Sequence, residues 1–127
     1  MKLILVFAII SCFMFGCSSS KKLKQSRVYL KQYAYCRCAM FASADSAFFS
    51  NDISTGTYAD IAQYSKSALN SIDNLARRYA SAIKPSVIAD HQNKKAILLN
   101  CFTFYESRQL DSLVKALDKE FMYTKGW

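Results

Sequence analysis

Five cysteines and one histidine are the side chains of this 127-residue chain best suited to nucleophilic chemistry or metal binding. A cysteine nucleophile needs a nearby base, and His91 is the one histidine available. His91 lies in the polar stretch Asp90 to Asn93, and no motif marks a third group that would orient it. One histidine and no cysteine pair at metal-ligand spacing cannot close a zinc site. We therefore expect no catalytic residue, no metal site and no cofactor.

The N-terminus has the pattern of an export signal. Lys2 precedes an apolar run, Leu3 to Phe15, that falls short of the roughly 20 apolar residues of a membrane-spanning helix. Met14-Phe15-Gly16-Cys17 resembles a lipobox, so Cys17 is expected to be acylated after residues 1–16 are removed. An uncleaved membrane anchor is the alternative.

The predicted organisation is a signal peptide (1–16), a lipidated tether (17–23) and one helical domain (24–127). Ser18 to Lys22 contain no apolar residue, which is typical of a short flexible tether. Ser18 after the cysteine indicates the outer membrane, so we expect a lipid-anchored protein of the periplasm.

Export and removal of the signal peptide affect both the net charge of the chain and the partners that this charge could attract. Without residues 1–16 the chain keeps a formal charge of +7, since Lys2 is the one charged residue removed. Nucleic acid suits such a charge but is absent from the export compartment, and we exclude it as a partner. Attraction to anionic lipid headgroups, helped by Lys21, Lys22 and Lys24, is favoured over a specific acidic ligand.

The scarcity of breakers predicts an all-α domain, a compact bundle of four to five helices. Pro85 is the one proline, and only Gly56 and Gly126 remain after the signal. The apolar spacing predicts a first helix over about 24–44, a helical turn near 44–49, a long second helix over 58–83 that follows a capping box at 57–60, a third over 94–105 and a last helix capped by Ser107.

Three cysteines remain in an oxidising compartment, where one pair can form. Cys36 and Cys38 are about 200° apart around a helix and point away from each other. Cys38 shares the apolar face of the first helix and Cys101 that of the third, so a Cys38–Cys101 disulfide is expected. A Cys36–Cys101 pair is the alternative, because sequence alone fixes helix phase imprecisely.

Two stretches resemble the small helical immunity proteins that neutralise peptidoglycan amidases of the type VI secretion system. One is Tyr33-Ala34-Tyr35-Cys36-Arg37-Cys38-Ala39, and the other runs from Asn100-Cys101 through Phe104-Tyr105 to Ser107 and Leu110. Asn100 and Thr103 stand where the family pattern has Lys and Asp. The resemblance extends over about Leu30 to Phe121.

The resemblance implies that the chain is no enzyme but occludes the active site of a cysteine amidase, often as a homodimer. Two other functions stay open: a structural envelope lipoprotein, and an inhibitor of another wall hydrolase such as lysozyme. An amidase gene beside this one would distinguish them.

The connection from Lys84 to Lys95 is the expected partner-binding segment. It is the longest polar interruption between periodic helices, and loops held by rigid elements often carry recognition. The candidate contact residues are Lys84, Asp90, His91, Gln92, Asn93 and Lys94. A plain solvated turn is the alternative, and the connection 43–56 is the next candidate.

Overall fold

The computed structural model describes residues 2–122, with side chains from residue 19 onward. Cys17, the expected acylation site, lies outside the described side chains. Within these limits the elements are α1 (Lys2–Ala42), α2 (Ser46–Asn51), α3 (Ser54–Ala62), α4 (Lys66–Ser81), the 3₁₀ helix η1 (Ala89–His91), α5 (Ile97–Tyr105), α6 (Arg108–Ala116) and the 3₁₀ helix η2 (Leu117–Glu120).

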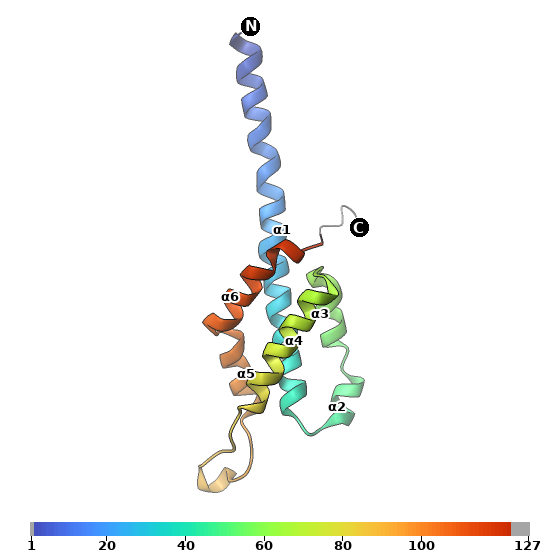
Figure 1. The fold of residues 1–127 in the computed structure, drawn as a ribbon, viewed down its shortest axis with the longest axis vertical. Helices are drawn as coiled ribbons and strands as arrows, with labels where there is room; N and C mark the ends of the chain where they lie inside the picture. The colour runs from blue at the N-terminus through green and yellow to red at the C-terminus, as the bar shows by residue number, and fades with distance from the viewer. Residues whose placement is uncertain (1, 123–127) are drawn as a thin grey trace.

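The predicted all-α bundle is confirmed, but the described residues form six α-helices instead of the expected four to five, and no strand (Figure 1). The central element is α1, against which α3, α4, α5 and α6 all pack. At its N-terminal end α1 extends beyond the bundle (Figure 1). Residues 19–22, expected as a flexible tether, belong to this helix. No helix of the described residues is long and apolar enough to cross a membrane.

The prediction of one long helix over 58–83 is wrong. The backbone leaves the helix at Gln63, which is left-handed with φ 56°, and α4 begins afresh at Ser65, whose hydroxyl accepts from Ala68 N at 3.1 Å. The interruption pairs with the C-terminal segment: Met122 N donates to Gln63 O at 2.7 Å, and Ser65 N donates to Glu120 O at 3.1 Å. A contact between segments so distant in sequence outweighs local helix propensity.

Other boundaries also differ from the expectation. The Thr57–Asp60 capping box does not start a helix, because α3 begins at Ser54 after Asp52, whose carboxylate accepts from Ser54 N at 3.0 Å. The first helix ends at Ala42, the helical turn is α2 at 46–51, and the third helix starts at Ile97, not at 94. Ser107 does cap the last long helix, as predicted, through Leu110 N at 3.2 Å.

The apolar faces of these helices meet in one core, as the periodicity predicts. Leu30 and Ala34 of α1, Ile72 of α4, Phe104 of α5 and Leu110 of α6 are all fully buried. Burial of each large side chain contributes about 1.5–3 kcal/mol, so this core is the main source of stability.

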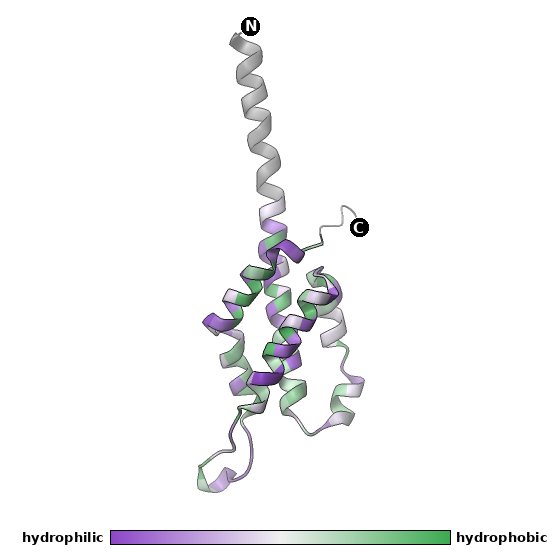
Figure 2. Cartoon of the chain, viewed as in Figure 1, coloured by the Kyte–Doolittle hydropathy of each residue, from purple (hydrophilic) through white to green (hydrophobic). Residues whose placement is uncertain are grey.

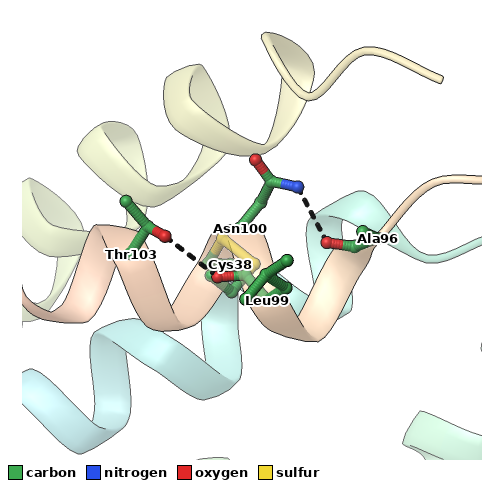
Figure 3. The surroundings of a disulfide bond; sticks show 6 residues. Cys38, Ala96, Leu99, Asn100 and Thr103 are labelled. Carbon is green, nitrogen blue, oxygen red and sulfur yellow. Dashed lines mark hydrogen bonds between the residues drawn. A yellow bond between two sulfur atoms is a disulfide. The ribbon is translucent and has the colours of Figure 1, made fainter. Parts of the chain in front are cut away.

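Polar and covalent links tie α1 to its neighbours. Arg37 donates from Nε and Nη2 to the two carboxylate oxygens of Asp73 on α4, both at 2.7 Å, and Tyr33 OH donates to the same carboxylate at 2.8 Å. Burial, and then the hydrogen bond to Asp73, raise the pKa of Tyr33. Cys38 is joined to Cys101 of α5 by a disulfide, with the two Cα atoms 5.7 Å apart (Figure 3).

Candidate partner-binding surface

The connection between α4 and α5 forms a closed loop that projects from the end of the bundle (Figure 1). Its two sides are joined by Ser86 N, which donates to Lys94 O at 2.8 Å. Within it, His91 N donates to Ile88 O at 2.9 Å, Lys94 N to His91 O at 3.1 Å, and Ile88 N to the Ser86 hydroxyl at 3.1 Å. Asn93, at φ 65°, takes a left-handed turn that asparagine tolerates. The loop is therefore held in its conformation by hydrogen bonds among its own residues.

Both stems of the loop are anchored in the bundle. Ile83, at the end of α4, is buried, and Pro85 follows where the helix has already ended. On the other side Ile97 packs against the core, and Cys101 fixes α5 to α1 through the disulfide. A loop held in this way can present its tip without folding around a partner first.

All six residues expected to bind a partner are exposed on this loop. Asp90 and His91 lie in η1, while Gln92 and Asn93 form the turn that follows it. Lys84 and Lys94 stand on the two stems. The structure thus brings these residues together in one loop.

The apolar residues of this surface were missed by the sequence analysis. Val87 is 94% exposed and Ile88 62% exposed, so two branched apolar side chains are exposed on a polar loop. The outer face of α5 adds Leu98, Leu99 and Phe102, each at least half exposed. The detectable signal was the run Ala96-Ile97-Leu98-Leu99, which has more apolar residues than one helix face can bury. Clustered exposed apolar side chains usually mark an interface.

A hollow lies between α3 and α5 over α1. Its volume is about 430 Å³, and it is lined by Gln32, Tyr35, Cys36, Ser54, Tyr58, Phe102 and Tyr105. Lys31 Nζ lies 4.6 Å from the centre of the Tyr105 ring and donates to Asp111 at 2.6 Å. The buried Oε1 of Gln32 has no hydrogen-bond partner among the described residues.

Cys36 is the unpaired cysteine of the described part of the chain and lines this hollow. Burial, and then the nearby Asp52 carboxylate, raise the pKa of its thiol. A raised pKa lowers the thiolate fraction and with it the nucleophilicity of the sulfur. His91 is not among the residues that line this hollow, and no three metal-ligating side chains gather anywhere between residues 19 and 122.

Asn100 and Thr103, which depart from the family pattern, bond to their own helix. Asn100 Nδ2 donates to Ala96 O at 2.8 Å and Thr103 Oγ1 to Leu99 O at 3.1 Å (Figure 3). The amide nitrogen of Asn100 and the hydroxyl of Thr103 therefore donate within their own helix.

A helical bundle that carries a hydrogen-bonded loop with exposed apolar side chains offers a surface suited to binding another protein. The chain belongs to the Tai4 family, the amidase immunity proteins of the type VI secretion system, whose family model matches residues 28–114. The suspected family resemblance is thereby confirmed. A search of curated proteins and a search of solved structures each find no match.

Proposed function

We propose that this protein binds a cognate peptidoglycan amidase delivered by the type VI secretion system and occludes its active site. The observation that carries the proposal is the projecting 84–95 loop, which is held by its own hydrogen bonds and exposes Val87 and Ile88. Family membership supplies the kind of partner.

The loop suits a cleft because it combines two kinds of contact. Val87 and Ile88 can fill an apolar hollow beside the substrate groove, and burying each contributes about 1.5–3 kcal/mol. Asp90, His91 and Gln92 add exposed donors and acceptors that can reach the catalytic cysteine and its base. Because the loop is already framed, little conformational entropy is lost on binding.

Inhibition by occlusion requires no chemistry from the inhibitor itself, and we propose that this chain is no enzyme. The raised thiol pKa of Cys36 supports this, since the sulfur stays largely protonated near neutral pH. An active-site block by packing and hydrogen bonds accounts for protection without turnover.

The target acts on peptidoglycan, so we place the protein in the periplasm, held by acyl chains on Cys17 at the outer membrane. Acyl chains, at about 0.8 kcal/mol per buried methylene, give lasting attachment when more than one is present. Mass spectrometry of membrane fractions should find an acylated N-terminal Cys17. An unmodified N-terminus elsewhere contradicts the proposal, and Cys17→Ala should release or stall the protein.

The functional test uses the amidase encoded beside this gene. Inhibition of peptidoglycan hydrolysis is measured for the wild-type chain, for Asp90→Ala/His91→Ala/Gln92→Ala and for the control Asp60→Ala/Ser67→Ala/Asn70→Ala. The loop variant should bind at least about tenfold more weakly, whereas the control, one acid and two polar residues away from the loop, should inhibit fully. Undiminished inhibition by the loop variant moves the site to the 43–56 connection.

We also propose that two copies associate, through the outer face of α5. The helix α5 is short and strongly apolar, and its side chains Leu98, Leu99 and Phe102 are exposed. A second copy of the chain could cover them. Analytical ultracentrifugation should find a dimer, and Leu98→Glu should dissociate it. A monomer at all concentrations contradicts this and assigns the face to the amidase instead.

A further inference from the structure

The bundle has two ends with different surroundings. At the N-proximal end η2 and the α3–α4 junction pack beside α1, where the Ser26 hydroxyl donates to Ala62 O and Arg27 pairs with Asp118. The other end holds the 84–95 loop (Figure 1). With a rise of about 1.5 Å per residue, α1 separates Arg27 from its last residue, Ala42, by roughly 22 Å.

Four exposed lysines from three segments gather at the N-proximal end. Lys21 and Lys24 are on α1, Lys66 begins α4 next to the Ser65–Glu120 contact, and Lys119 lies in η2 next to Asp118. Figure 2 shows hydrophilic residues both where α1 enters the bundle and over η2. We call these four lysines the N-proximal lysine cluster.

The carboxylates nearby neutralise this cluster only in part. Asp118 is paired with Arg27, with Nε at 2.8 Å from its Oδ1, whereas Glu120 accepts from the neutral Ser65 hydroxyl and keeps its negative charge. Asp60, in the last turn of α3, adds one exposed carboxylate. The described ion pairs join Arg27, Lys31 and Arg37 to carboxylates and use none of the four lysines.

Exposed apolar side chains accompany the lysines. Met122 is half exposed where its backbone pairs with Gln63, and Val28 is exposed on α1 one turn beyond Lys24. Lysines around a few apolar side chains are typical of a surface that rests on lipid headgroups.

Charge alone does not distinguish the two ends, because Lys84, Lys94 and Lys95 lie at the loop end. The direction of α1 does. Its N-terminal part leaves the bundle at the N-proximal end, and the chain continues there into the apolar run Leu3 to Phe15. The N-terminus can meet a bilayer either through acyl chains on Cys17 or through the uncleaved apolar segment. In both cases the lysine cluster is the part of the domain that comes directly after the membrane-attached segment.

We propose that the N-proximal lysine cluster binds the surface of an anionic phospholipid bilayer, so that the 84–95 loop points away from the membrane. This docking is independent of acylation at Cys17 and goes beyond the binding of an amidase. It holds the partner-binding loop at the far end of the domain, open to an enzyme arriving from the wall. Each lysine near such a surface strengthens binding by about fivefold at moderate ionic strength.

The test measures lysine accessibility in the full-length chain reconstituted with vesicles. The rate of acetylation by an amine-reactive ester is followed by mass spectrometry in phosphatidylcholine vesicles and in vesicles that also contain phosphatidylglycerol. Lys24, Lys66 and Lys119 should react several-fold more slowly in the anionic vesicles, whereas Lys84, Lys94 and Lys95 should not change. High salt should abolish the difference, because it shortens the Debye length.

Matched variants separate docking from general charge. Lys24→Gln/Lys66→Gln/Lys119→Gln should lose the protection of Lys21 by anionic vesicles, while Lys84→Gln/Lys94→Gln/Lys95→Gln should keep it. Equal protection of both ends, or none, overturns the proposal. Protection of the lysine cluster by purified peptidoglycan but not by anionic vesicles also overturns it and makes the wall polymer the partner.

Discussion

The interior where α1 meets α4 and α5 differs from the 84–95 loop in what holds each in place. The interior is fixed by long-range links: the Cys38–Cys101 disulfide spans 63 residues, and Arg37 reaches Asp73 on another helix. The loop is fixed by short-range backbone hydrogen bonds and leaves Val87 and Ile88 in water. If the loop binds the amidase as proposed, stability and recognition depend on different residues, and substitutions should affect one property without the other.

Removal of the disulfide should have the largest effect on stability. Closing a loop of this length contributes about 4 kcal/mol by chain entropy, so Cys38→Ala/Cys101→Ala should lower the free energy of unfolding by an amount of that order. Chemical denaturation under oxidising conditions measures it. Cys36→Ala is the control and should change little; equal losses for both variants would show that Cys36 takes part in the pairing.

The next largest effect is expected at Asp73. Asp73→Ala leaves the Arg37 guanidinium and the Tyr33 hydroxyl without their acceptor in a half-buried site, which should cost about 2 kcal/mol. Asp111→Ala, which breaks the more exposed pair with Lys31, should cost less than about 1 kcal/mol. The two denaturation midpoints decide whether the α1–α4 link is as important as its geometry indicates.

Tyr64 gives the interior a pH dependence at alkaline pH. Burial, and then Asp118, raise the pKa of Tyr64 to about 12, above the value near 10 of an unfolded tyrosine. Its contribution to stability is therefore complete below about pH 10 and is lost as the pH rises toward 12. Tyr64→Phe should weaken this alkaline loss in a pH series of thermal unfolding; an unchanged profile would contradict it.

At neutral pH the same variant should be nearly neutral. The buried Tyr64 hydroxyl has no hydrogen-bond partner among the described residues, so its removal leaves no acceptor or donor stranded. A loss above about 1 kcal/mol would reveal a hydrogen bond that the structure lacks.

The smallest effect on stability is expected in the loop. Val87→Ala/Ile88→Ala removes exposed side chains, so the free energy of unfolding should stay within about 0.5 kcal/mol of wild type. A larger loss would mean that these two side chains pack on the bundle, and the loop would then contribute to stability as the interior does.

The sequence predicted the features that depend on local periodicity and missed those set by distant contacts. The spacing of Leu30, Ala34 and Cys38 placed these residues on one buried face, which is why the facing cysteines could be paired. The break at Gln63 could not be foreseen in the same way, because it depends on backbone pairing with Glu120 and Met122. Ser65 was the one local signal, since serine favours helix N-caps.

The candidate surface was also predicted only in part. Polarity and the position of Pro85 located the loop and placed Asp90 and His91 on it as candidates, but an exposed Val87 is indistinguishable from a buried one by residue type alone. The exposed fractions of Val87 and Ile88 in the folded chain were needed to assign these two side chains to the surface.

The most direct test of the central claim is inhibition of the cognate amidase by Val87→Ala/Ile88→Ala, compared with Lys24→Gln/Lys66→Gln/Lys119→Gln. The measured quantity is the inhibition constant for peptidoglycan hydrolysis with purified proteins in solution. We predict that the loop variant is weakened at least about tenfold, as expected for hot-spot residues, while the lysine variant inhibits like wild type. Full inhibition by the loop variant would contradict the assignment of amidase binding to this loop.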